Sequence, residues 1–160
     1  HYLQVIADKT GSLIAASALF GAMVAGASQE IQDALAAYGE EVGLVFQLSD
    51  DIIDITSDVT GKTPGTDLRE GVPTLPTLLL ADSQDPADQP LKDLLAGDLS
   101  DDAALVEALT ALRSHPVIER SRAQVRHHAS LARQHLGPLP DGEAKQLLLQ
   151  VCDDLVERSA

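Results

Sequence analysis

The sequence predicts an all-α fold with one modest core. Hydrophobic residues make up 44% of the 160 residues but aromatic residues only 2%, so Leu, Ile, Val and Ala must build the core. Ala and Leu are strong helix formers, and runs of β-branched residues are rare. In long stretches the apolar residues recur at spacings of three and four, which is the period of an amphipathic helix.

The first predicted helix covers residues 2–25. We expect one stripe of its side chains to face the core, namely Leu3, Ile6, Thr10, Leu13, Ser17, Phe20 and Val24. Lys9 borders this stripe, which is an unusual position for a charged residue. Gly26 and Ser28 then provide a helix end and a new N-cap.

The second predicted helix covers residues 29–56 and has two distinct faces. Its core face consists of Ile31, Leu35, Tyr38, Val42, Val45, Ser49 and Ile52. A second stripe is small at one end and acidic at the other, and it consists of Ala36, Gly39, Gly43, Gln47, Asp50 and Asp54. Each glycine costs about 1 kcal/mol relative to alanine in a helix interior, so we expect another backbone or a ligand to approach closely there.

Residues 57–74 break the helical pattern, because glycines and prolines recur through them. We therefore predict a long loop, and long loops in compact domains are often functional. A short helix follows over residues 75–81, with Pro76 in its first turn. After a polar connection, further helices are predicted over residues 91–95, 101–113, 116–136 and 141–158.

Charge and cysteine content argue against several classes of protein. A formal net charge of −14 argues against a nucleic-acid-binding protein, which would carry a basic patch. Cys152 is the only cysteine, so no intramolecular disulfide can form and a reducing, cytoplasmic location is expected. No run reaches about 18 uninterrupted apolar residues, so no transmembrane segment is predicted. His1 starts directly in a helical pattern, and we expect the sequence to be part of a longer chain.

Three carboxylates lie close together near the end of the second predicted helix. Asp50 and Asp54 stack one turn apart, and Asp51 lies within reach of Asp54. Gln47 lies one turn before Asp50 on the same side. Carboxylates this close repel each other without a cation, and Mg²⁺ binds one or two carboxylates together with water and phosphate oxygens. The alternative is an acidic helix end in water.

Two lysines occupy positions that suit a phosphate. Lys62 lies in a glycine-containing loop, although the Walker A pattern is absent. A lysine on a flexible loop can hold a phosphate as a point charge. Lys9 borders the apolar stripe of the first helix. Each could instead be an ordinary solvent-exposed lysine, but with the aspartates they indicate Mg²⁺-assisted diphosphate chemistry.

The order of these motifs resembles the trans-isoprenyl (polyprenyl) diphosphate synthases. The matching motifs are Lys-Thr at residues 9–10, Phe-Gln-x-x-Asp-Asp-x-x-Asp at 46–54, Gly-Lys-x-x-Gly-x-Asp-Leu at 61–68 and Thr-Leu-Pro at 74–76. The resemblance extends over essentially the whole chain, and the combination is far more specific than any one motif.

The resemblance implies an isoprenoid synthase-type helical bundle around a central cavity, usually in a homodimer, of which residues 1–160 are the C-terminal portion. It implies Mg²⁺-dependent condensation of isopentenyl diphosphate with an allylic diphosphate. By position, Asp50, Asp51 and Asp54 would be the second aspartate-rich metal motif, with Asp50 the direct ligand.

The resemblance also implies roles for other positions. Lys9 and Lys62 would hold the allylic diphosphate. Thr10 and Gln47 would line the cavity near the reacting carbon, and Phe46 would join Gln47 in binding the substrate.

The chain departs from the family pattern in two ways. The first aspartate-rich motif and the basic residues for isopentenyl diphosphate are absent from residues 1–160, so the piece alone is expected to be inactive. Val72 stands where many members have a lysine. A non-catalytic family subunit that acts as an interaction partner is the alternative, and a terpene cyclase is a third reading that the Phe-Gln and Gly-Lys motifs disfavour.

Overall fold

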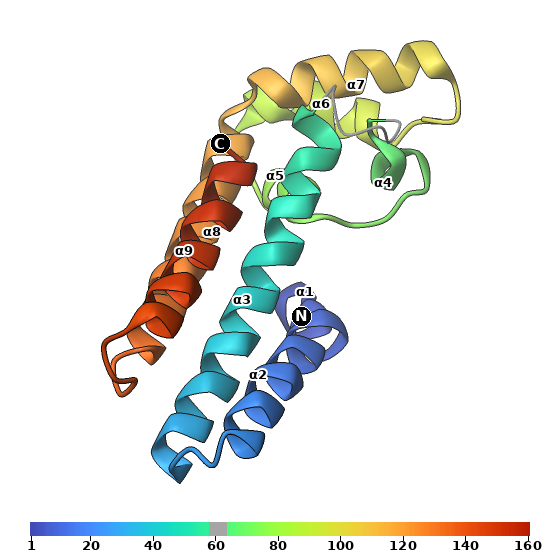
Figure 1. The fold of residues 1–160 in the computed structure, drawn as a ribbon. Helices are drawn as coiled ribbons and strands as arrows, with labels where there is room; N and C mark the ends of the chain where they lie inside the picture. The colour runs from blue at the N-terminus through green and yellow to red at the C-terminus, as the bar shows by residue number, and fades with distance from the viewer. Residues whose placement is uncertain (58–63) are drawn as a thin grey trace. The chain divides into compact units, whose positions relative to one another are not determined.

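The structure is a computed structural model that describes residues 1–57 and 64–160. Every regular element in these residues is a helix, which confirms the all-α prediction (Figure 1). In chain order the elements are α1 (Tyr2–Ile6), the π-helical turn η1 (Ala7–Gly11), α2 (Ser12–Val24), α3 (Gln29–Thr56), α4 (Thr66–Arg69), α5 (Leu75–Ala81), the 3₁₀ turn η2 (Pro86–Asp88), α6 (Gln89–Leu95), α7 (Asp102–Ser114), α8 (Pro116–His135) and α9 (Glu143–Arg158).

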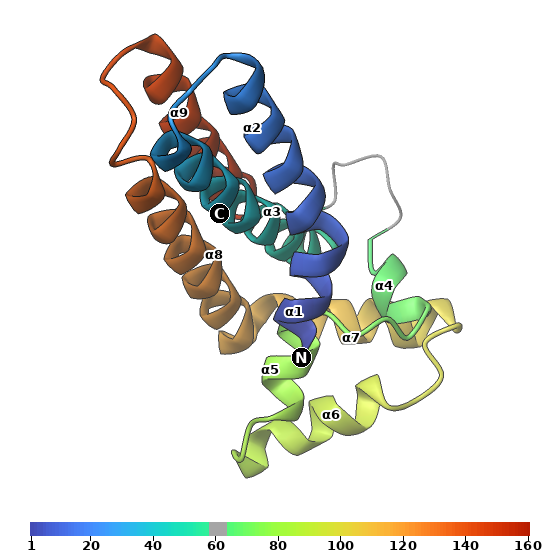
Figure 2. The same cartoon turned by 90° about the horizontal axis from the view of Figure 1, so that it is seen from below.

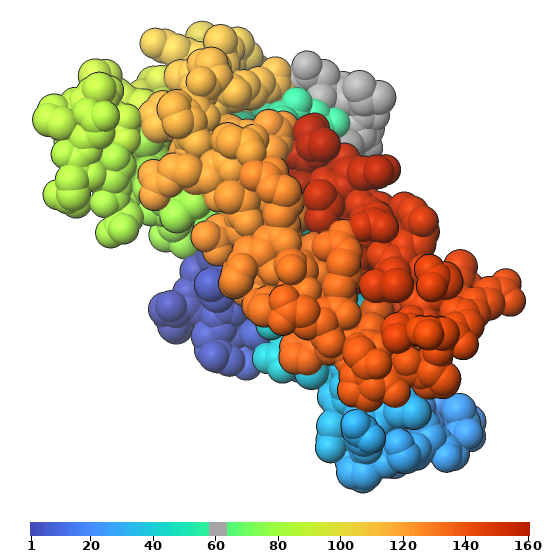
Figure 3. Space-filling view, turned by 90° about the vertical axis from the view of Figure 1, so that its left-hand side faces the viewer, coloured from blue at the N-terminus to red at the C-terminus, as the bar shows by residue number. Residues whose placement is uncertain are grey.

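The described chain divides into two compact units, whose boundaries fall within α3 and α8. The first unit comprises His1–Ser49 and Gln124–Ala160, and the second comprises Asp50–Ala123. In the first unit, α2 lies along one side of α3 and the pair α8–α9 along another (Figures 1 and 2). Figure 3 shows α8 and α9 side by side on one face of this unit.

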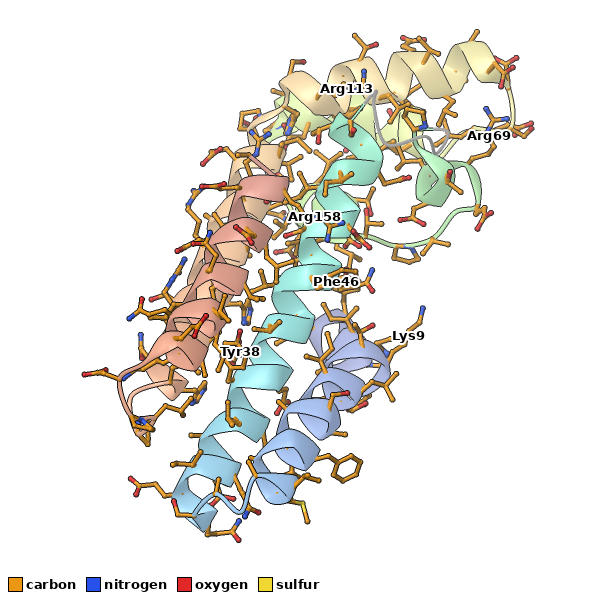
Figure 4. The ribbon with its side chains drawn as sticks, in the orientation of Figure 1. Lys9, Tyr38, Phe46, Arg69, Arg113 and Arg158 are labelled. Carbon is orange, nitrogen blue, oxygen red and sulfur yellow. The ribbon has the colours of Figure 1, made fainter. Side chains whose placement is uncertain are left out.

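Buried polar contacts tie α3 to α9 in the first unit. The Tyr38 hydroxyl donates a hydrogen bond to the carbonyl of Leu148 at 2.8 Å, and the Ser49 hydroxyl donates one to the carbonyl of Leu155 at 3.0 Å. Tyr38 points from α3 toward α9 (Figure 4). Burial raises the pKa of the Tyr38 hydroxyl well above its usual range, so it stays protonated and able to donate. These bonds satisfy polar groups that would otherwise be costly to bury.

We expect the thiol of Cys152 to react slowly in the folded chain. The residue is 1% exposed, and burial raises the pKa of its thiol, so little reactive thiolate is present at pH 8. Titration of residues 1–160 with a disulfide reagent should show slow labelling in buffer and rapid labelling in guanidinium chloride. Immediate stoichiometric labelling in buffer would show that α9 is not packed as described.

The predicted core stripe of the first helix was wrong. Its large side chains are exposed: Leu13 is 68%, Phe20 61% and Val24 90% exposed. Of the predicted stripe only Ile6 is buried, and the other buried residues of this run are the small residues Ala7, Gly11 and Ala22. The π-helical turn at Ala7–Gly11 explains part of the error, because its i→i+5 bonding shifts the register of the following residues around the helix.

Residues 2–24 form the one helical run in the described chain that is long and apolar enough to cross a membrane. Only 22% of its most apolar window is buried. The run is interrupted by Asp8 and Lys9, and length and composition alone are weak evidence, because the core helix of a globular protein passes the same test. The absence of a transmembrane segment therefore stays a prediction.

The second unit packs short helices around the end of α3. Ile52 and Ile55 of α3, Leu80 of α5 and Leu112 of α7 are almost completely buried. The guanidinium of Arg113 donates a hydrogen bond to the carbonyl of Ile55 at 2.7 Å, which satisfies a carbonyl of the last turn of α3. The predicted loop at residues 57–74 is not wholly irregular, because it contains the one-turn helix α4.

Candidate active site

The small face of α3 allows an unusually close approach to the preceding helical run. A Cβ placed on Gly43 would lie 2.5 Å from the Cα of Gly11, and one on Gly39 would lie 2.6 Å from the Cα of Ala15. Both distances are far shorter than real Cβ contacts allow, so only glycine fits at these two positions. This confirms the prediction that the glycines of the second helix serve a backbone contact.

This contact brings two predicted site residues together. Thr10 lies on the π-helical turn directly before Gly11, and its hydroxyl donates a long hydrogen bond of 3.4 Å to the side-chain carbonyl of Gln47. The adjacent Lys9 is exposed, and its side chain extends away from the helix (Figure 4). π-helical turns often occur at functional sites. The turn therefore presents a threonine to α3 and a lysine to the outside.

Phe46 has a cationic neighbour that the sequence did not reveal. The guanidinium carbon of Arg158 lies 5.0 Å from the centroid of the Phe46 ring, within the range of a cation–π interaction (Figure 4). Arg158 is the last residue of α9, where a positive charge is also favourable for the helix dipole. No local sequence signal links residues so far apart along the chain, so only the fold could show this pair.

In the second unit, Asp51 is buried and bonded to a helix terminus. The residue is 3% exposed, and its Oδ2 accepts a hydrogen bond from the amide of Leu75 at 2.8 Å. Leu75 is the first residue of α5, where the amide has no partner within the helix.

Asp54 binds a second helix terminus. Its Oδ1 accepts from the amide of Thr66 and its Oδ2 from the amide of Asp67, both at 3.2 Å, and its carbonyl accepts from the amide of Gly65 at 2.8 Å. Thr66 and Asp67 are the first two residues of α4. The spacing of these carboxylates predicted a metal role, but it did not predict their contacts with backbone amides.

The acidic residues of α3 offer an all-oxygen donor set, which is the chemistry that Mg²⁺ prefers. Within the described residues, no group of three or more His, Cys, Asp or Glu side chains is arranged to hold a metal ion. Asp50 is half-buried, in contrast to Asp51. Mg²⁺ commonly uses one or two carboxylates and completes its octahedron with phosphate oxygens and water, so these residues fit a partly protein-built site and not a closed carboxylate cage.

Lys62 and Val72 are the two remaining positions that the sequence singled out. Lys62 lies outside the described residues, so its predicted role stays a prediction. Val72, at the position where many family members have a lysine, is exposed. Its amide donates a hydrogen bond to the carbonyl of Asp67 at 2.8 Å.

Comparison with known proteins agrees with the family resemblance of the sequence motifs. The sequence profile of the polyprenyl synthetase family matches residues 1–112. The nonaprenyl diphosphate synthase of Mycobacterium tuberculosis is 44% identical over 160 residues, which cover 99% of this chain and 48% of that protein.

Solved structures agree with the sequence match. Geranylgeranyl pyrophosphate synthase from Corynebacterium glutamicum, complexed with calcium and isoprenyl diphosphate, superposes with a TM-score of 0.92 at 42% identity, covering 99% of this chain and 50% of that one. Polyprenyl synthase from Caulobacter crescentus, also complexed with calcium and isoprenyl diphosphate, gives 0.88 at 30% identity, with coverages of 99% and 49%. The chain thus spans about half the length of these relatives, and it belongs to the polyprenyl synthetase family.

Proposed function

We propose that residues 1–160 form the C-terminal portion of a single synthase domain. We call the natural chain that includes the rest of that domain the complete chain, and we propose that it condenses isopentenyl diphosphate with an allylic diphosphate to make a longer polyprenyl diphosphate. The observation that carries this proposal is the Phe-Gln-x-x-Asp-Asp-x-x-Asp motif on one continuous helix, α3, in a chain whose named relatives are prenyl diphosphate synthases.

In this proposal Asp50 is the direct ligand of Mg²⁺, and Asp51 and Asp54 belong to the same acidic motif. Bound Mg²⁺ would neutralise charge on the allylic diphosphate as it leaves. The calcium in two solved relatives supports a divalent cation as the cofactor. Among divalent cations we propose Mg²⁺, because it suits a site whose coordination is completed by diphosphate oxygens.

Lys9 and Lys62 would bind the allylic diphosphate. A diphosphate gains negative charge on leaving, so lysine charges placed beside it stabilise the transition state more than the ground state. Thr10 and Gln47 would lie near the reacting carbon, where their hydrogen bond keeps both side chains oriented. Phe46, held against Arg158, would help to shape the substrate-binding wall.

Metal-dependent binding tests this assignment before any chemistry occurs. Calorimetric titration of the complete chain with an unreactive allylic diphosphate analogue should show binding with Mg²⁺, and at least about tenfold weaker binding with EDTA. Lys9→Gln should weaken the Mg²⁺-dependent binding. Absence of binding with Mg²⁺ would argue for the non-catalytic alternative, in which the chain serves as an interaction partner.

We further propose a homodimer located in the cytoplasm, with no nucleic-acid partner and no transmembrane segment. The net charge of −14 would repel nucleic-acid phosphates. A single buried cysteine suits a reducing compartment.

Residues 1–160 on their own are expected to associate and to be inactive. Leu13, Phe20 and Val24 of α2 are all more than half exposed, and the chain spans about half the length of its relatives, so we expect the complete chain to cover apolar side chains that residues 1–160 leave in water. Light scattering should detect species larger than a monomer, and a hydrophobic dye should bind; Phe20→Gln should reduce both signals. A monomer that does not bind the dye, or measurable product formation by residues 1–160, would contradict this expectation.

A further inference from the structure

The aspartates of the Asp-Asp-x-x-Asp motif on α3 differ in how accessible they are to a cation. Asp51 is 3% exposed. Additional protein can only lower this exposure further. Mg²⁺ gives up its water shell reluctantly and usually keeps several waters, so it needs a ligand oxygen that a hydrated ion can reach. Asp51 offers no such surface, whereas Asp50, one residue earlier and about 100° around the helix, is half-buried.

The Asp51 carboxylate already has a structural partner. It accepts the hydrogen bond of the Leu75 amide at 2.8 Å, which is the first amide of α5. The neighbouring amide of Thr74 is satisfied separately, by the hydroxyl of Thr77 at 3.0 Å. A carboxylate beside a helix N-terminus is stabilised by both the free amide and the helix dipole.

The packing around this contact has little freedom. Thr74, Leu75 and Pro76 are all buried, and α5 is only seven residues long. A helix of this length has little stability of its own. Its position on α3 therefore depends on tertiary contacts, of which the Asp51–Leu75 bond is a directional one.

We propose that Asp51 is a positioning residue that fixes the start of α5 against α3 and does not contact the metal. In the second aspartate-rich motif of this chain, Asp50 then binds the metal and Asp51 holds the start of α5. Removing the Asp51 charge then loosens the start of α5, while the Mg²⁺ requirement is governed by Asp50. The metal part of this inference rests on the proposed function.

The test compares Asp51→Asn with Asp50→Asn in the complete chain, with three readouts. Without metal, Asp51→Asn should lower the melting temperature by about 3 °C or more and speed hydrogen exchange in a peptide that covers residues 74–80, and Asp50→Asn should change neither. In turnover assays, Asp50→Asn should raise the Mg²⁺ concentration for half-maximal rate by roughly tenfold or more, and Asp51→Asn should leave it within about twofold.

A second pair of variants breaks the same bond without changing a carboxylate. Leu75→Pro removes the amide hydrogen at a helix position that tolerates proline, and Leu75→Val keeps the hydrogen while losing similar packing. Leu75→Pro should be less stable than Leu75→Val and should not shift the Mg²⁺ midpoint. If Asp51→Asn does not fold, this pair still tests whether the bond to the Leu75 amide positions α5.

A Mg²⁺ midpoint raised by Asp51→Asn as far as by Asp50→Asn overturns the proposal, whatever the melting temperature. Equal stability and exchange for Asp51→Asn and wild type, or for the two Leu75 variants, also overturns it. If the wild-type complete chain makes no product, the proposed function fails, but the metal-free stability and exchange comparison still tests the role of Asp51.

Discussion

Replacing Asp50 by asparagine in the complete chain is expected to lower turnover by at least about a hundredfold. The loss of one preorganised group that stabilises developing charge commonly costs two to three orders of magnitude in rate. The carboxylate is half-buried on α3, and the substitution removes its charge with almost no change in volume. Helicity and the melting temperature without metal should therefore stay close to wild type. Single-turnover kinetics at saturating Mg²⁺, together with circular dichroism, would measure both effects.

Asp33→Asn is the matched control for this experiment. Asp33 is an exposed aspartate of the same helix, and its Oδ1 accepts a hydrogen bond from the side chain of Gln29 at 2.7 Å. Its replacement should leave turnover within about twofold, because surface substitutions have small effects. Near-normal turnover of Asp50→Asn would remove this residue from the proposed metal role.

Gly43→Ala is expected to destabilise the protein by about 2 kcal/mol, although alanine is the better helix former. The new Cβ would meet the Cα of Gly11 at 2.5 Å and its nitrogen at 2.9 Å, and both are backbone atoms that no side-chain rotation can move away. Overpacking of this kind costs about 1–3 kcal/mol, and the strain is relieved only if the two helices move apart. That movement would also separate Thr10 from Gln47, so turnover should fall by up to about a hundredfold.

Gly21→Ala provides the opposite control. Gly21 lies in α2, and a Cβ added to it would meet no described neighbouring atom within 4 Å. Alanine there should stabilise the protein by about 0.5–1 kcal/mol through helix propensity. Urea unfolding of both variants in the complete chain would give the two values. If Gly43→Ala were as stable as Gly21→Ala, the close helix contact would not exist as described.

Local signals explain why two helices could be predicted to the residue. The bounds Gln29–Thr56 of α3 and Leu75–Ala81 of α5 agree with the predicted ranges. Before α3, Gly26 has a positive φ of 70°, and the hydroxyl of Ser28 accepts the amide of Ile31 at 3.4 Å. Such end signals involve residues within a few positions of each other, so they can be read directly from a sequence.

The apolar stripe of the first helix failed because its burial depends on tertiary context. Its periodicity indicated one face of a helix, but periodicity does not say what covers that face. The π-helical turn at Ala7–Gly11 has no comparable sequence signal and changes which residues meet α3. The small residues, by contrast, did predict the contact, because a glycine in a helix interior needs a packing reason.

The candidate site was predictable in composition and only partly in structure. Residue types and spacing identified Thr10, Gln47 and the three aspartates, and the structure shows the Thr10–Gln47 hydrogen bond. The partner of Asp51 is an amide 24 residues later in the chain, and the partner of Phe46 comes from the last helix. Contacts of this kind are created by the fold, and the spacing of residues in the sequence does not predict them.

The most direct test of the proposed function is elongation by the complete chain. It would be incubated with radiolabelled isopentenyl diphosphate, an allylic diphosphate primer and Mg²⁺, in parallel with an EDTA-treated sample, and the products would be sized. We predict labelled polyprenyl diphosphates that are longer than the primer with Mg²⁺ and none with EDTA. No elongation from any allylic primer in the presence of Mg²⁺ would contradict the proposed activity and favour a non-catalytic subunit.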